Sequence, residues 1–152
     1  MNCFKTLFAV LVLYRHNMQV LHWNATGKQF DRVHKICDEY TEKLGECIDS
    51  IAEKLIMCGE RPLSYEEVLT QVKEDEKEFV MLTTDVQYCF ACAFSAINDM
   101  FETLIKLYNE VLTTVELPTG MKSSLESELE WFELEKCYKN EKRLAEPEDC
   151  CE

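Results

Sequence analysis

Two pairs of potential metal ligands lie between residues 34 and 53. His34 and Asp38 form one pair, and Asp49 and Glu53 form the other. The four-residue spacing within each pair places both side chains on one face of a helix. Imidazole and carboxylate groups are suitable ligands for Fe(II). One such pair alone is typical of a solvated helix face, but two pairs in phase indicate a metal site.

The two pairs share a helix face, yet one copy of the helix cannot join them around a single centre. Asp38 and Asp49 are eleven residues apart, which is close to three turns and a rise of about 16.5 Å. Two copies packed antiparallel about a twofold axis would set the first pair of one copy against the second pair of the other, making two equivalent sites. Gly45 lies beside the expected crossing point and would permit close approach. His22 could add a further ligand from the subunit that supplies His34.

The segments that carry these residues are predicted to be helices. Only four Gly and three Pro interrupt the chain, and the stretches between them have apolar side chains at three- and four-residue spacing. Ser64 and Glu67 form a capping box that predicts a short helix in the connection 59–82, and Thr84 with Gln87 predicts a second such start. The long helices are expected at about 2–26, 28–58, 84–114 and 121–143.

This order of elements predicts an all-α, ferritin-like four-helix bundle with a short extra helix in the long crossover between helices 2 and 3. We expect the bundle to occupy residues 1–145 and an acidic, flexible tail to occupy residues 146–152. The first helix contains no carboxylate and has apolar residues on several faces. Its surface is therefore expected to be covered by the bundle and by a neighbouring subunit.

The charge balance argues against a polyanionic partner. The chain has 29 Asp and Glu against 16 Lys and Arg, a formal net charge of −13, so DNA is repelled and cations are attracted. Lys5 is the only basic residue before Arg15, so the first helix has no Lys-rich segment that could bind DNA. We therefore predict no direct DNA binding. Four carboxylates of the last long helix are candidates for a surface that attracts Fe(II): Glu126, Glu128, Glu130 and Glu133.

The cysteines and the apolar segments predict a cytoplasmic protein without a membrane span. Nine cysteines at irregular spacing, without a convincing secretion signal, fit a reducing compartment better than a disulfide framework. The apolar run 7–14 is too short to cross a bilayer. Cys89 and Cys92 lack the further ligands of a structural zinc site, and we interpret them as small buried residues within a helix.

The stretch from Leu21 to Leu63 resembles the Dps miniferritins, a family within the ferritin-like proteins. The resemblance covers about residues 7–143 and is most specific in His22-Trp23-Asn24, Gly27 and Gly59-x-x-Pro62-Leu63. It implies a ferroxidase centre between subunits, with two histidines and an acidic residue from one subunit and an Asp and a Glu from its twofold partner. The matching positions are His22, His34, Asp38, Asp49 and Glu53.

The same resemblance implies a function and an assembly. It implies oxidation of Fe(II) at dinuclear iron sites, with zinc or manganese as possible substitutes, hydrogen peroxide as the favoured oxidant, and ferric storage in a hollow shell of twelve subunits. Trp23 would be an electron donor or radical trap, or else an aromatic residue packed across the dimer. Two alternatives stay open: a DNA-binding nucleoid protein of this type, and a structural helical-bundle oligomer with little oxidase activity.

Overall fold

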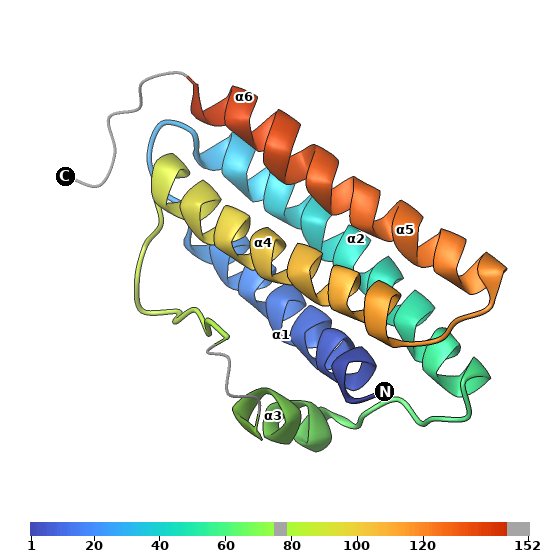
Figure 1. Cartoon of the computed structure of the whole chain (residues 1–152). Coiled ribbons are helices and arrows are strands. Elements are labelled where there is room, and N and C mark those ends of the chain that lie inside the picture. Colours follow the sequence, from blue (N-terminus) through green and yellow to red (C-terminus); the bar gives the residue numbers. More distant parts are fainter. Residues whose placement is uncertain (75–78, 146–152) are drawn as a thin grey trace.

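Four long helical rods lie side by side in the computed structural model, which describes residues 1–74 and 79–145 (Figure 1). A short helix, α3, lies across the end of the bundle that contains the N-terminus. This arrangement confirms the all-α, ferritin-like bundle with an extra helix in the long crossover. The elements are α1 (Asn2–Asn24), α2 (Phe30–Met57), α3 (Tyr65–Glu74), α4 (Phe90–Thr114), α5 (Thr119–Leu134), the π-helical turn η1 (Glu135–Lys139) and α6 (Asn140–Leu144).

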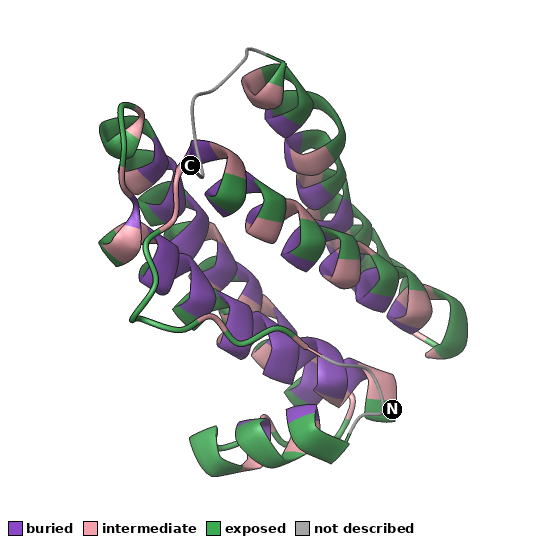
Figure 2. Cartoon of the chain, turned by 90° about the vertical axis from the view of Figure 1, so that its left-hand side faces the viewer, coloured by how far each residue is buried: buried purple, intermediate pink, exposed green. Residues whose placement is uncertain are grey.

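Helix α1 is the most deeply buried long helix, and it packs against α2, α3 and α4. Figure 2 shows the buried residues on the faces that the helices turn toward one another. A stripe on α1 stays exposed, and it consists of Arg15, His16, Gln19 and Trp23. Within the described residues, none of the helices has an apolar stretch long enough to cross a membrane.

The turn between α1 and α2 brings the two helices together antiparallel. Gly27 has a φ of +99°, which a residue with a Cβ rarely adopts. Gly45, in the middle of α2, has the Arg15 guanidinium over its open face, and a Cβ built on Gly45 would lie 3.4 Å from Arg15 Nε. The space beside Gly45 is therefore lined by an exposed side chain of the same chain.

The predicted capping box at the start of α3 is confirmed. The Ser64 backbone N–H donates to Glu67 Oε1 at 3.0 Å, and the Glu67 N–H donates to Ser64 Oγ at 3.3 Å. Arg61 also binds the Glu67 carboxylate with two hydrogen bonds of 2.8 and 2.7 Å. These contacts hold the pKa of Glu67 well below its usual range, chiefly through the Arg61 hydrogen bonds.

The expected start of the third long helix near Thr84 is wrong, because α4 begins at Phe90. The Asn24 side chain donates to the carbonyls of Thr84 and Val86 at 2.8 and 2.9 Å. Tyr88 pairs with Ala25 in an isolated parallel bridge. These contacts hold the segment before α4 beside the end of α1, so Thr84 and Gln87 do not begin a helix.

Candidate metal centre

His22 and His34 lie against each other where α1 ends and α2 begins. Their ring centroids are 3.6 Å apart with an interplanar angle of 20°. His22 Nδ1 is 2.8 Å from the His34 carbonyl oxygen, and His34 Nδ1 is 2.8 Å from the His22 carbonyl oxygen. The two histidines therefore hold each other in one orientation through a reciprocal pair of hydrogen bonds.

These hydrogen bonds determine which nitrogen of each ring can bind a metal. A carbonyl oxygen only accepts hydrogen bonds, so Nδ1 of both rings must carry the proton. In a neutral imidazole Nε2 then has the free lone pair, which is the usual arrangement for a metal-binding histidine whose other nitrogen is held by the protein. Both side chains are half-buried, so the site is accessible from solvent.

Aromatic side chains flank the histidine pair. The Phe30 ring lies 5.0 Å from the His34 ring. Trp23 is 56% exposed, and the edge of its ring meets His16 at a centroid distance of 6.1 Å. The contact between His16 and Trp23 was not predicted, although their seven-residue spacing on one helix could have indicated it. Trp23 is thus next to the histidine pair in sequence and open to a molecule that covers this face.

The carboxylates of the predicted site all lie on the exposed surface of α2. Asp38 is one helical turn beyond His34, and Asp49 and Glu53 lie further along the same unbroken helix. In the described part of the chain, none of the three forms an ion pair or hydrogen bond. The described residues also contain no group of three or more His, Cys, Asp or Glu placed to hold one metal ion. Among the described residues, one protomer thus brings the two histidines together, but it joins neither Asp38 nor Asp49 and Glu53 to them in one ligand group.

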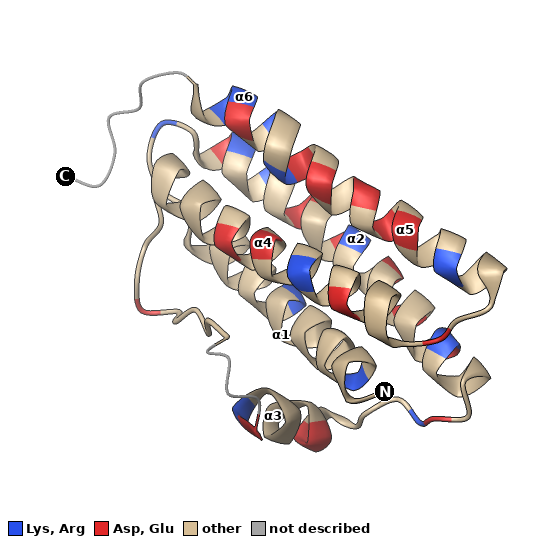
Figure 3. Ribbon diagram, viewed as in Figure 1, with Lys and Arg blue, Asp and Glu red and all other residues tan. Residues whose placement is uncertain are grey.

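Negative charge is distributed unevenly over the bundle. Figure 3 shows α1 almost free of charged residues, whereas acidic residues recur along α2, α4 and α5. Of the four carboxylates proposed for α5, only Glu126, Glu130 and Glu133 are exposed. Glu128 accepts hydrogen bonds from Tyr108 and Ser50 at 2.8 and 2.7 Å. Its inclusion among the surface carboxylates that attract Fe(II) is therefore wrong.

The cysteines occupy different environments. Burial raises the pKa of Cys37 and of Cys47 to about 12, which keeps both as thiols near neutral pH. The interpretation of Cys89 and Cys92 as small buried residues within a helix is wrong. Cys89 caps the start of α4, Cys92 is exposed, and both are disulfide-bonded. The other described cysteines are free, and Cys150 and Cys151 lie outside the described residues.

The Ferritin-like domain family matches residues 7–137, so fold and sequence together define a ferritin-like protein. The DNA protection during starvation protein of Helicobacter pylori is 31% identical over 110 residues, which cover 70% of this chain and 69% of that protein. The chain belongs to the Dps miniferritins of the ferritin-like family.

Solved structures share the fold. Helicobacter cinaedi CAIP has a TM-score of 0.81 at 20% identity, covering 94% of this chain and 97% of its own. The Dps protein of Vibrio cholerae O1, described as a member of a broad superfamily of ferritin-like diiron-carboxylate proteins, has a TM-score of 0.61 at 20% identity, covering 93% and 82%.

Proposed function

We propose that this protein oxidises Fe(II), its substrate, and stores the ferric product inside a homo-oligomeric shell of twelve subunits. His22, His34 and Asp38 of one protomer and Asp49 and Glu53 of its twofold partner would bind the iron. The observation that carries the proposal is the reciprocal hydrogen bonding of the two histidines, which leaves both Nε2 lone pairs for a metal.

The exposed carboxylates supply the second part of the argument. Asp49 and Glu53 are one turn apart on α2 and are not neutralised by any cation of the described chain. Unpaired carboxylates on one face favour a site that binds cations. With hydrogen peroxide as oxidant, two Fe(II) ions give one electron each, and two protons are taken up as one peroxide becomes two waters. This stoichiometry releases no hydroxyl radical.

Direct binding to DNA is not part of the proposal. The formal net charge of −13 opposes a polyanion. The acidic residues of α2 are exposed, as are Glu126, Glu130 and Glu133 of α5. Any protection of DNA would follow from removal of Fe(II) and peroxide. A gel-shift assay at low salt should therefore show no change in DNA mobility.

Stopped-flow measurement of Fe(II) oxidation tests the proposed ligands. Anaerobic Fe(II) is added first and peroxide second, with the double variant His22→Ala/His34→Ala compared with His16→Ala. The control removes an exposed histidine of the same helix. The double variant should lose the fast phase, and His16→Ala should keep it. Equal rates for all three proteins would overturn the assignment.

Mixed assemblies test whether the site is shared between subunits. His22→Ala/His34→Ala protomers are unfolded, mixed with Asp49→Ala/Glu53→Ala protomers and reassembled. A mixed dimer would have one site with all five ligands and one site that keeps only Asp38, so random pairing should restore about a quarter of the wild-type sites. If each site lay within one protomer, mixing would restore no activity. Light scattering of the reassembled particles reports their mass and controls for failed assembly.

A further inference from the structure

A second group of chemically active side chains lies on the opposite side of α2 from the exposed carboxylates. The Tyr40 hydroxyl donates to Glu135 Oε2 at 2.8 Å, and the Tyr108 hydroxyl donates to Glu128 Oε1 at 2.8 Å. Tyr40 is 2% exposed and Tyr108 is fully buried. The two glutamates are seven residues apart and so lie on one face of α5 and η1. The core thus contains two phenols that each have a carboxylate as proton acceptor.

Aromatic contacts connect the two phenols. The Tyr40 and Trp131 ring centroids are 5.6 Å apart, Trp131 and Phe132 are 5.0 Å apart, and Phe132 and Tyr108 are 5.6 Å apart. Phe101 provides a parallel route, at 5.0 Å from Tyr40 and 5.2 Å from Phe132. Every step of the path is therefore a direct ring contact.

Glu135, the proton acceptor of Tyr40, is held in its ionised form. Burial raises the pKa of Glu135, but hydrogen bonds and charge from Lys139, Tyr40 and Arg143 outweigh this effect and lower the pKa overall. Lys139 Nζ is 2.9 Å and Arg143 3.3 Å from the Glu135 carboxylate. Burial raises the pKa of both tyrosines. Each phenol thus keeps its proton until an electron is also removed.

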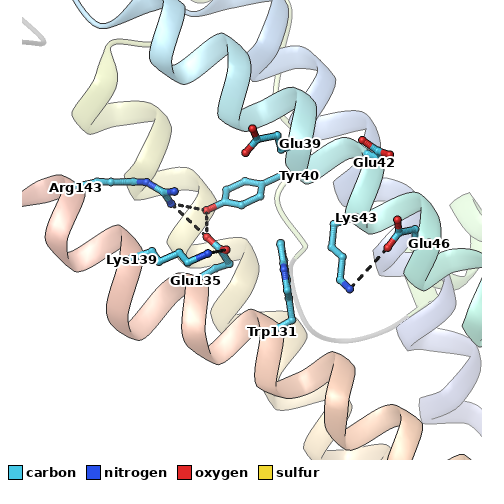
Figure 4. Close-up of a pocket in the computed structure, with 9 residues that line it drawn as sticks. All are labelled: Glu39, Tyr40, Glu42, Lys43, Glu46, Trp131, Glu135, Lys139 and Arg143. Carbon is cyan, nitrogen blue, oxygen red and sulfur yellow. Dashed lines mark hydrogen bonds and ion pairs between the residues drawn. The ribbon is translucent and has the colours of Figure 1, made fainter.

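The path reaches solvent at one place. Trp131 and Tyr40 line a pocket of about 360 Å³ between α2 and the α5–η1 rod. Figure 4 shows the Tyr40 hydroxyl directed toward Glu135 and Arg143, with Trp131 between Tyr40 and Lys43. Trp131 is half-buried, and Lys43 Nζ lies 5.4 Å from its ring centroid. A small oxidant in the pocket can therefore contact the Trp131 ring without any opening of the core.

We propose that Trp131, Tyr40 and Tyr108 form a one-electron relay that reduces strong oxidants, such as hydroxyl radical, and stores the missing electron as a buried tyrosyl radical. The oxidant takes an electron from Trp131, and Trp131 takes one from Tyr40 or Tyr108. The phenolic proton passes to Glu135 or Glu128, leaving a neutral tyrosyl radical and a carboxylic acid. A later electron from Fe(II) or a thiol, with return of that proton, restores the phenol and the carboxylate. The relay does not depend on the proposed iron site.

The test uses the full-length, metal-free protein and a photochemical oxidant. A ruthenium polypyridyl complex is excited in the presence of persulfate, and the sample is frozen for electron paramagnetic resonance. The background variant Tyr65→Phe/Tyr138→Phe removes two exposed tyrosines, 69% and 57% exposed. We expect a long-lived tyrosyl signal in this background, and loss of most of it in Tyr40→Phe/Tyr108→Phe. Trp131→Phe should lower its yield.

Two controls separate a relay from a structural role. Tyr14→Phe removes a buried tyrosine that has its hydroxyl beside Thr103, and it should keep the signal. Glu135→Gln keeps the shape of the side chain but cannot take up a proton in the same way, so the Tyr40 radical should decay faster. An undiminished signal in Tyr40→Phe/Tyr108→Phe would overturn the proposal.

If these variants fail to fold, a measurement on the wild-type protein still tests the relay. The radical that the same photochemical oxidation forms in the wild-type protein is examined by high-field electron paramagnetic resonance, whose g-values report hydrogen bonds to the phenoxyl oxygen. A long-lived tyrosyl signal with a strong hydrogen bond, as expected from protonated Glu135 or Glu128, supports the relay. A short-lived tyrosyl signal without such a hydrogen bond contradicts it. Because no iron is present at any step, a negative result here does not bear on the Fe(II) oxidation proposed above.

Discussion

Helix α2 carries acidic and aromatic residues on two faces that differ in how their charges are satisfied. On one face Asp38, Asp49 and Glu53 are exposed, and no described residue neutralises them. On the face toward η1, Tyr40 meets Glu135, whose side chain is 6% exposed and ion-paired with two cations. Carboxylates that stabilise a fold are paired when they are buried. Carboxylates left open on a rigid helix are instead available to bind a cation or a partner.

Substitutions on the two faces should therefore have different effects, one on the rate of iron oxidation and the other on the stability of the fold. Loss of the open carboxylates should affect iron chemistry and leave the fold intact. Loss of the buried carboxylate should affect the fold and leave the iron ligands in place. Each of the following changes tests one side of this division.

The largest expected effect is on iron oxidation in Asp49→Asn/Glu53→Gln. The initial rate of Fe(II) oxidation should fall by more than about 100-fold, because metal ligands are lost rather than the groups that orient them. The midpoint of thermal unfolding should not fall. Glu39→Gln/Glu42→Gln, on the same helix, is the matched control and should retain the rate. A wild-type rate of Fe(II) oxidation in Asp49→Asn/Glu53→Gln would show that these two carboxylates are not iron ligands.

The next effect is on stability in Glu135→Ala. Removing this carboxylate leaves Arg143 partly buried without its ion-pair partner, so the free energy of unfolding should fall by about 3 kcal/mol. Glu133→Ala removes an exposed carboxylate of α5, and the free energy of unfolding should change by less than about 0.5 kcal/mol. Urea denaturation measures both. Equal free energies of unfolding for the two variants would show that the ion pairs of Glu135 contribute no more to stability than an exposed carboxylate does.

The same carboxylate predicts a pH dependence. The pKa of Glu135 is lowered below its ordinary value of 4.5 in the folded protein. The unfolded state therefore binds the proton more readily, and the stability from this group is present above that value and lost as the pH falls through the folded pKa. The difference in unfolding free energy between wild type and Glu135→Gln should shrink between pH 6 and pH 3. A difference that grows on acidification would contradict the assigned direction.

Sequence patterns predicted the helices well because long apolar periodicities and scarce Gly and Pro leave few alternative folds. The Ser64–Glu67 capping box was also predictable, since both of its hydrogen bonds are local. The start of α4 was missed because Asn24, sixty residues away in the chain, holds the Thr84 carbonyl. Burial of Glu128 was missed for the same reason, since it depends on Tyr108 and on packing between helices.

The candidate site was predictable in part. The shared helix face of His34, Asp38, Asp49 and Glu53 follows from their spacing along α2, whereas their role as iron ligands, and that of His22, stays a prediction. The reciprocal hydrogen bonds of the histidines follow only from the antiparallel packing of α1 on α2. Whether Asp49 and Glu53 meet the histidines of a second protomer depends on an interface, and that part of the site stays a prediction.

The smallest expected effect concerns Gly45, between the two ligand pairs. In Gly45→Ala the new methyl group would make an ordinary van der Waals contact with the exposed Arg15 side chain, 3.4 Å from its Nε. A helical Ala in place of Gly gains about 0.5–1 kcal/mol of stability. If the partner's α2 crosses here, the same methyl group should also weaken dimerisation in sedimentation equilibrium. Gly120→Ala, near the start of α5 with open space around it, should leave dimerisation unchanged. Equal dimer dissociation constants for both variants would show that the twofold axis does not pass near Gly45. The proposed pairing of the histidines with the partner's carboxylates would then be wrong as well.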